Sequence, residues 1–185
     1  MKITLASASP RRRELIAKIK NLTVEILPSG ADESLVAASS PRELAENLAR
    51  IKAQSVFNAH GGIVLGADTI VTIDGKVLGK PKTEAEACEF LRLLSGRTHE
   101  VITGIAIINK EKTIVKSEVA HVTFRKITEC EITDYVSHGS PMDKAGGYGI
   151  QDAEVMAFTE SVDGDKDNVI GLPVALVKKT LEENF

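Results

Sequence analysis

Apolar side chains along the chain alternate between two spacings, one typical of strands and the other typical of helices. Runs with the spacing and β-branched content of strands occupy residues 2–6, 62–73, 77–78, 101–108 and 113–124. The dipeptide Asp74-Gly75 separates two of these runs and favours a type I′ hairpin turn, because both residues tolerate positive φ. The last two runs meet near Asn109 and are expected to pair antiparallel. Hairpins mixed with helices predict an α/β (α+β mixed) fold with a mixed sheet rather than a doubly wound parallel one.

Capping residues mark where the predicted helices begin. Ser9 supplies an N-cap and Pro10 a first-turn proline for a helix that follows the first strand. Three further starts have the spacing of a capping box, in which a Ser or Thr and a Glu three residues later bind each other's backbone N–H: Ser40/Glu43, Thr83/Glu86 and Thr128/Glu131. We expect the second helix to bury a face that carries Leu44, Leu48 and Ile51.

The composition is that of an ordinary globular protein. The chain has 185 residues, 43% of them hydrophobic, and 23 Lys and Arg against 26 Asp and Glu give a formal net charge of -3. No linker or repeat divides it, so we expect a single domain over residues 1–185. The charge balance disfavours a nucleic-acid binder, and no apolar run reaches the ~20 residues that span a membrane. The first residues lack the apolar core of a secretory signal, so we expect a cytoplasmic protein.

The first candidate for chemistry is the stretch from Ser7 to Arg13, between the first strand and the first helix. Helix-start N–H groups attract anions, serine hydroxyls donate further hydrogen bonds, and arginine forks match phosphate oxygens. The pattern therefore predicts a phosphate-binding loop. A capped helix with solvated arginines explains the same residues about equally well. The sequence has no Walker A lysine motif, so P-loop chemistry is not indicated.

Asp68 follows the apolar run Ile63-Val64-Leu65, where an unpaired carboxylate is costly. It is suited to hold a divalent cation and to orient or deprotonate a water; the alternative is a turn aspartate that accepts from its own backbone. Lys80 sits between a glycine and a proline, so its ammonium is either directed at the same pocket or solvated. Glu33 is a loop acid that serves equally well as a metal ligand or in no role.

A glycine-rich segment precedes Gln151. Gly146, Gly147 and Gly149 allow the backbone to approach a ligand closely, and the Gln151 amide offers a donor and an acceptor to the edge of a base. The same segment is also explained as a flexible turn.

Several short elements follow one another along the chain: Ser7-Ala8-Ser9-Pro10-Arg11-Arg12, Asp32-Glu33, Ala49-Arg50-Ile51-Lys52-Ala53, Gly66-Ala67-Asp68-Thr69, Gly79-Lys80-Pro81, Ser95-Gly96, Asp143-Lys144-Ala145-Gly146, Tyr148-Gly149-Ile150-Gln151 and Val169-Ile170-Gly171-Leu172-Pro173. Together they resemble the Maf family of nucleoside triphosphate pyrophosphatases over nearly the whole chain. The resemblance implies a strongly bent mixed sheet flanked by helices, similar to the inosine triphosphate pyrophosphatase fold, with the site in a cleft between two lobes.

The resemblance also implies an activity, the hydrolysis of dTTP and UTP to the nucleoside monophosphate and pyrophosphate. Water attacks the α-phosphorus, and a divalent cation, Mg²⁺ or Mn²⁺, offsets phosphate charge. The family's proton acceptor corresponds to Asp68. The residues that separate its substrate branches correspond to Arg11, Thr69 and Gln151, which match the dTTP/UTP branch; the branch that cleaves 7-methyl-GTP carries Trp, Gln and Glu there. The other implied roles are phosphate contacts at Ser7, Arg12, Lys52, Lys80 and Lys144, and metal ligands at Glu33 and Asp68.

Alternatives remain open at this point. CTP or a modified pyrimidine nucleotide could be a substrate, and the family suggests a homodimer without nucleic-acid or membrane partners. The family also carries a septum-formation label, so the alternative function is a nucleotide-binding regulator without physiological turnover. An intact Asp68 argues against binding alone, and a phosphatase would be distinguished by release of inorganic phosphate instead of pyrophosphate.

Overall fold

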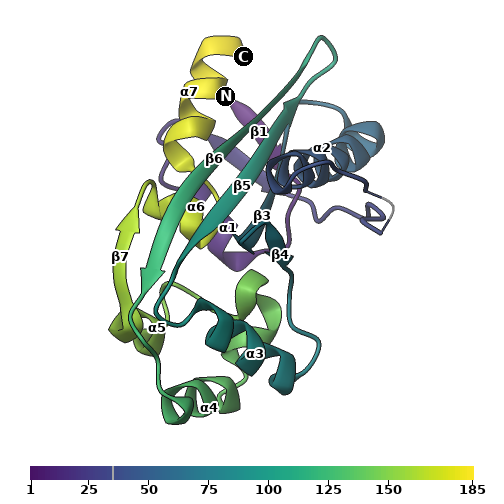
Figure 1. Ribbon diagram of the computed structural model, residues 1–185. Coiled ribbons are helices and arrows are strands. Elements are labelled where there is room, and N and C mark those ends of the chain that lie inside the picture. Colours follow the sequence, from purple (N-terminus) through teal and green to yellow (C-terminus); the bar gives the residue numbers. More distant parts are fainter. Residues whose placement is uncertain (35) are drawn as a thin grey trace.

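The computed structural model describes residues 1–34 and 36–185, which form one sheet of seven strands with helices on both faces (Figure 1). The strands are β1 (Lys2–Leu5), β2 (Thr23–Ile26), β3 (Val64–Ile73), β4 (Lys76–Leu78), β5 (Thr98–Ile108), β6 (Thr113–Phe124) and β7 (Thr159–Asp163). Their order is β2-β1-β3-β5-β6-β7, with β4 paired to β3. β1 runs parallel to β2 and β3 and the other pairs are antiparallel, which confirms the predicted mixed sheet.

The helices divide among the two faces and one end of the sheet. They are α1 (Pro10–Ile16), α2 (Pro41–His60), α3 (Glu84–Leu94), α4 (Glu129–Ser137), α5 (Ala153–Phe158), α6 (Lys166–Ile170) and α7 (Val174–Asn184), with 3₁₀ turns at Ser140–Asp143 and Ala145–Gly147. α2 packs on one face and α1, α6 and α7 on the other, while α3, α4 and α5 gather at one end of the long strands (Figure 1). We call α3, α4 and α5 with their shared core the small lobe. None of the described helices is long and apolar enough to cross a membrane.

The two predicted hairpins are confirmed. β3 and β4 turn at Asp74 and Gly75, whose φ values of +52° and +74° are those of a type I′ turn. β5 and β6 pair antiparallel from Thr98 opposite Thr123 to Ile108 opposite Thr113. These long strands carry the sheet from the main body of the molecule into the small lobe (Figure 1).

Two glycines of the sheet allow α2 to lie very close to it. A Cβ on Gly66 of β3 would lie 2.2 Å from the carbonyl oxygen of Ala49, and one on Gly104 of β5 would lie 2.3 Å from that of Ala45. Any side chain at either position would therefore push the helix away from the sheet. The two glycines set the distance between α2 and the sheet, and this distance positions the side chains on the inner face of the helix.

The inner face of α2 differs from the predicted one. Its buried residues are Ala45, Leu48, Ala49, Ala53 and Val56. Leu44 and Ile51 are only partly buried, so the prediction that they belong to the buried face is wrong. At the two glycines there is room for methyl groups but not for larger side chains, and the helix is rotated so that Ala45, Ala49 and Ala53 face the sheet there.

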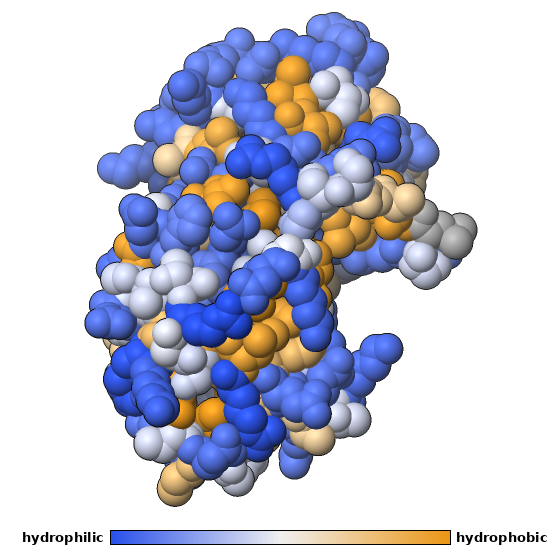
Figure 2. Space-filling view, in the orientation of Figure 1, coloured by the Kyte–Doolittle hydropathy of each residue, from blue (hydrophilic) through white to orange (hydrophobic). Residues whose placement is uncertain are grey.

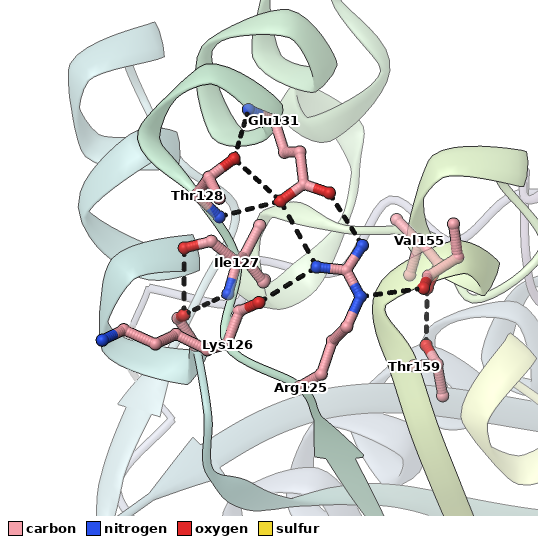
Figure 3. A network of polar contacts seen from close by, with 9 residues as sticks. Arg125, Lys126, Ile127, Thr128, Glu131, Val155 and Thr159 are labelled. Atoms are coloured by element: carbon pink, nitrogen blue, oxygen red, sulfur yellow. Dashed lines mark hydrogen bonds and ion pairs between the residues drawn. The ribbon is translucent and has the colours of Figure 1, made fainter.

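The predicted capping box at the start of α4 is complete (Figure 3). Glu131 N donates to Thr128 Oγ1 at 3.3 Å, and Thr128 N donates to Glu131 Oε2 at 2.8 Å. The side chain of Arg125 also donates to Glu131, and hydrogen bonds from Arg125 and Thr128 lower the pKa of Glu131 to about 2. This network joins the end of β6 to the small lobe.

The other two predicted capping boxes are wrong in the partner of the glutamate. Ser40 and Thr83 cap their helices as expected, but the glutamates accept from the backbone N–H of the residue before the cap, Ser39 and Lys82. The φ of the cap is -80° at Thr128 but -147° at Ser40 and -142° at Thr83. This rotation presents a different N–H to the glutamate.

Candidate active site

A cavity of about 690 Å³ opens between the small lobe and the main body of the molecule, and Figure 2 shows the surface hollowed there. It lies beside the part of β3 where one edge is open. β3 pairs with β1 as far as Leu65 and with β4 from Val71, and no strand of the described chain pairs with that edge in between. The residues predicted to form the site all line this cavity: Ser7, Arg11, Arg12, Glu33, Lys52, Asp68, Thr69, Lys80, Lys144 and Gln151.

Asp68 faces α2 from the open stretch of β3. It is two residues after Gly66 and on the same face of β3; at Gly66 the helix approaches closely through Ala49 and Ala53, and Lys52 extends from this part of α2 to the carboxylate. Lys52 Nζ donates to Asp68 Oδ1 at 2.5 Å and lies 3.1 Å from Glu33 Oε2. The side chains of Lys52 and Asp68 are only 13% and 15% exposed. One ammonium therefore holds two carboxylates at the cavity wall.

Arg12 reaches from α1 to the opposite face of β3 and is held by neutral oxygens. Its Nε donates to the carbonyl oxygen of Gly171 at 2.8 Å, its Nη2 to Thr69 Oγ1 at 3.1 Å, and its Nη1 to Ser7 Oγ at 3.5 Å. Burial lowers the pKa of Arg12, and the nearby charge of Asp68 opposes that shift. Arg12 takes part in none of the ion pairs found among the described residues. Its positive charge is thus available to an anion in the cavity.

Thr69 belongs to a polar chain that runs beneath the cavity wall. Its hydroxyl lies 2.9 Å from Thr103 Oγ1, which donates to the carbonyl oxygen of Asn168 at 3.0 Å. Thr103 N donates to Asn168 Oδ1 at 3.1 Å, and Asn168 Nδ2 donates to the carbonyl oxygen of Val101 at 2.9 Å. Thr103 and Asn168 are both 0% exposed. The side chain of Asn168 therefore fastens α6 to β5 directly under Thr69.

The wall on the side of the small lobe carries charges that are already paired. Lys144 Nζ lies 3.0 Å from Asp143 Oδ1 and 3.7 Å from Asp152 Oδ2. Arg11 Nη1 donates to Asp143 Oδ2 at 3.4 Å, which joins α1 to the first 3₁₀ turn. The charge of Lys144 is balanced more fully than that of Arg12.

Tyr148 is a buried part of the same wall. Its hydroxyl is hydrogen-bonded to Nε2 of His99 at 2.7 Å, and both rings pack edge to face on Phe124. Burial raises the pKa of Tyr148 and lowers the pKa of His99 to about 4. A neutral tyrosine and a neutral histidine therefore anchor this wall.

The glycine-rich segment packs on β3 through Gly146. Its φ is +72°, and a Cβ there would lie 2.9 Å from the side chain of Val71. Gly146 N donates to the carbonyl oxygen of Gly79 at 3.0 Å, which ties this segment to the loop that carries Lys80. Gln151, at the far end of the segment, is exposed at the cavity.

Two carboxylates in the cavity suit a magnesium or manganese ion. Glu33 Oε2 and Asp68 Oδ1 converge on the same lysine nitrogen, and Mg²⁺ is commonly held by one or two carboxylates together with substrate phosphates. The described residues include no group of three His, Cys, Asp or Glu that could hold a metal ion. Water and phosphate oxygens would have to complete the coordination of a cation here.

Sequence reasoning did not identify Thr103, Asn168 or the bond between Tyr148 and His99. A signal for the first of these exists in the sequence, since Thr103 interrupts the apolar run from Val101 to Ile108. A polar residue in a run that is buried on both faces needs a partner. Which residue supplies that partner is not encoded locally, because Asn168 lies 65 positions away.

Comparison with known proteins identifies relatives along the whole chain. A dTTP/UTP pyrophosphatase of Bacillus mycoides (strain KBAB4) is 50% identical over 183 residues, which cover 98% of this chain and 95% of that protein. A protein of the same name from Bacillus cereus (strain G9842) is 49% identical with the same coverage.

Two solved structures share the fold. The Ham1 protein of Staphylococcus aureus matches with a TM-score of 0.59 at 14% identity, covering 100% of both chains. A HAM1 protein of Coxiella burnetii matches with a TM-score of 0.57 at 19% identity, covering 99% of both chains. These matches agree with the fold that the sequence resemblance implied. The family model of the Maf-like proteins matches residues 2–184, and the chain is a member of the Maf family.

Proposed function

We propose that this protein hydrolyses dTTP and UTP to the nucleoside monophosphate and pyrophosphate. The relatives that bear the name of this activity match nearly the whole chain at about half of its positions. The observation that carries the proposal is the cavity itself, which collects the pair of Asp68 and Lys52, the unneutralised charge of Arg12, and all three residues of the dTTP/UTP branch.

The triphosphate binds between α1 and the loop that carries Lys80. Arg12 provides the strongest attraction, because its hydrogen bonds to neutral oxygens orient the guanidinium without cancelling its charge. Ser7 and Lys80 line the same wall and contribute further donors. Lys144 contributes less, since two carboxylates already share its ammonium.

Asp68 accepts the proton of the attacking water. Lys52 holds Oδ1 of the carboxylate and so fixes its orientation, and the second carboxylate oxygen takes the water. The hydroxide that results attacks the α-phosphorus, and pyrophosphate leaves. The cationic side chains of the cavity stabilise the charge that builds up on the leaving group.

Glu33 and Asp68 are the residues that would hold a divalent cation, Mg²⁺ or Mn²⁺. When bound, such a cation offsets the charge of the phosphates and lowers the barrier to attack. Lys52 binds one oxygen of each carboxylate, Glu33 Oε2 and Asp68 Oδ1, so it keeps the two carboxylates together at the cavity wall.

Gln151, Arg11 and Thr69 select the pyrimidine. The Gln151 amide is neutral and offers both a donor and an acceptor, which suits the carbonyl groups and the N–H of uracil or thymine. A carboxylate at this position would suit a cationic methylated guanine better. CTP and modified pyrimidine nucleotides are candidate additional substrates because they share the ring size.

The enzyme acts in the cytoplasm as a homodimer, without nucleic-acid or membrane partners, and removes unwanted nucleotides from the pool. Light scattering coupled to size-exclusion chromatography tests the dimer. No observation on this chain favours the alternative of a regulator that binds nucleotides without turnover.

Product analysis tests the proposed reaction. The purified protein is incubated with dTTP, UTP, CTP, GTP and 7-methyl-GTP, each with Mg²⁺, with Mn²⁺ and with a chelator. We expect monophosphate and pyrophosphate from dTTP and UTP, and only in the presence of a cation. Preferred turnover of 7-methyl-GTP would contradict the substrate assignment, and release of inorganic phosphate would contradict the reaction.

A further inference from the structure

Thr69 reaches the cavity from the face of β3 that lies opposite Asp68. Side chains alternate along a strand, so Thr69 shares its face with Val71, and its register partner Thr103 lies beside it on β5. Val71 and Val101 form apolar parts of the same cavity wall. The hydroxyl of Thr69 thus lies beside apolar side chains in a part of the wall with few other polar groups besides Arg12, and its hydrogen-bonding polarity matters to a ligand.

The hydroxyl protons of Thr69 and Thr103 can be assigned by counting the donors and acceptors around them. Thr103 Oγ1 has one proton, and its partner at 3.0 Å, the carbonyl oxygen of Asn168, can only accept. The proton of Thr103 therefore points to Asn168. In the 2.9 Å contact between the two threonines, Thr69 must then be the donor and Thr103 the acceptor.

A competing assignment is less favourable. Thr69 could instead donate to the carbonyl oxygen of Gly171, but that distance is 3.4 Å, and this oxygen already accepts from Arg12 Nε at 2.8 Å. Such an arrangement would also direct the proton of Thr103 away from Asn168. It would replace the 3.0 Å bond to Asn168 by a 3.4 Å one, and hydrogen bonds weaken steeply toward such distances.

We infer that Thr103 and Asn168 are positioning residues that hold the hydroxyl proton of Thr69 inside the protein, so that Thr69 presents only an acceptor to the cavity. Arg12 Nη2 takes one lone pair of Thr69 Oγ1 at 3.1 Å, and the other is left for the ligand. The inference rests on the proposed function, because it describes how the same cavity distinguishes nucleotides.

The ligand group that Thr69 selects is a hydrogen-bond donor. A uridine or thymidine nucleotide supplies one at two places, the imide N–H of the base and the hydroxyl of the sugar. Cytosine has no imide N–H, since its ring nitrogen at that position is an acceptor, and its own donor is the 4-amino group in the place of a uracil carbonyl. An acceptor at Thr69 therefore favours uracil over cytosine if it faces the ring nitrogen of the base, and favours a sugar hydroxyl over hydrogen if it faces the sugar.

The test compares Thr103→Val with Thr103→Ser. Valine has nearly the shape of threonine but no hydroxyl, so it releases the proton of Thr69, whereas serine retains the chain. Thr98→Val is the matched control. Thr98 of β5 forms a similar pair with Thr123 of β6, with 2.8 Å between the hydroxyl oxygens, and neither residue lines the cavity. Calorimetry measures the affinity of each protein for UMP, CMP and 3′-deoxy-UMP, which requires no turnover.

We expect Thr103→Val to lower the preference for UMP over CMP by about tenfold, the value of roughly one hydrogen bond. Thr103→Ser and Thr98→Val should keep the wild-type preference. If Thr69 faces the sugar, Thr103→Val instead lowers the preference for UMP over 3′-deoxy-UMP, which supports the inference equally. Preferences that are unchanged in Thr103→Val, or changed as much in Thr103→Ser, would overturn it.

Two further outcomes remain decisive. If Thr103→Val does not fold, Thr103→Cys replaces it; a thiol is a weak donor and acceptor, so the preference should fall in the same direction, and an unchanged preference overturns the inference. If the wild-type protein binds none of the three nucleotides, the base and the sugar contribute no recognition and the inference fails, whereas the proposed function is decided separately by the product analysis on the triphosphates. Binding by the wild type with no effect of Thr103 overturns the inference alone.

Discussion

Two arginines of this protein, one in the cavity and one between β6 and the small lobe, are held in opposite ways. Arg125 donates to both oxygens of Glu131 and to the carbonyl oxygen of Lys126 (Figure 3), and its bonds to Glu131 raise its pKa. It also donates to the carbonyl oxygen of Ala157. Arg12 also donates from all three of its nitrogens, but its partners are all neutral, and burial lowers its pKa.

The difference separates structural from functional use of the same side chain. When a guanidinium is paired with a carboxylate, its charge is neutralised within the protein and the pair stabilises the fold. A guanidinium held by hydroxyl and carbonyl oxygens keeps its charge, which costs stability until an anion arrives. The partners of a charge, rather than the charge itself, identify the site.

The largest effect is expected from Asp68, the cavity carboxylate. Asp68→Asn should lower turnover of dTTP by about three orders of magnitude, because the proton acceptor is lost. Affinity for the nucleotide should stay within about tenfold, since Arg12 and its neighbours are untouched. Steady-state kinetics and calorimetry measure the two effects.

Asp74→Asn provides the matched control for this carboxylate. Asp74 lies in the hairpin turn at the end of the same strand and pairs with Arg97, and asparagine tolerates its φ of +52°. Turnover should be unchanged. Full turnover by Asp68→Asn would show that the cavity carboxylate is not the proton acceptor.

The second prediction tests the two arginines directly. Arg12→Met should lower kcat/KM by about 100-fold, because a charge-assisted phosphate contact is lost, and its thermal midpoint should equal or exceed that of the wild type. Arg125→Met should have the reverse pattern, with a lower thermal midpoint and unchanged kcat/KM. Similar losses of stability in both variants would break the comparison.

The third prediction concerns the neutral pair of His99 and Tyr148. The pKa of His99 is about 4 in the folded protein and ordinarily 6.5, so only the unfolded chain binds a proton between these values. Stability is therefore complete above pH 6.5 and falls as the pH is lowered toward 4, by roughly 3 kcal/mol in all.

Urea denaturation between pH 7 and pH 5 measures about 2 kcal/mol of this loss, before most paired carboxylates titrate. His99→Gln can still bind the Tyr148 hydroxyl but does not titrate, so its stability should vary less over this range. Equal pH dependence in both proteins would show that another group is responsible.

The smallest effect is expected from Gln151. Gln151→Glu should lower turnover of dTTP and UTP by about tenfold, because a carboxylate faces carbonyl oxygens of the base, while other nucleotides should be affected less. Gln54→Glu on α2, outside the cavity lining, introduces the same charge and should leave all rates unchanged. An equal loss on every nucleotide would make Gln151 structural.

Local features were predictable from the sequence because their causes are local. The hairpin at Asp74 and Gly75 depends on two adjacent residues, and the caps at Ser40 and Thr83 depend on the first turn of each helix. The partners of the two capping glutamates were not predictable, since a rotation of one backbone angle moves the N–H that each one meets.

The list of cavity residues came from the sequence, whereas their chemistry depends on contacts across long separations. The sequence by itself determined the alternation of strands and helices, the helix starts and the set of residues that marks the family. Only the tertiary structure decided that the inner face of α2 is its alanine face, that Arg12 meets the carbonyl oxygen of Gly171, 159 residues away, and that Thr69 rests on Thr103. Burial and charge pairing depend on which distant groups the fold brings together. Because they set the charge and the free hydrogen-bonding groups of a side chain, residue type alone does not determine how that side chain interacts with a ligand.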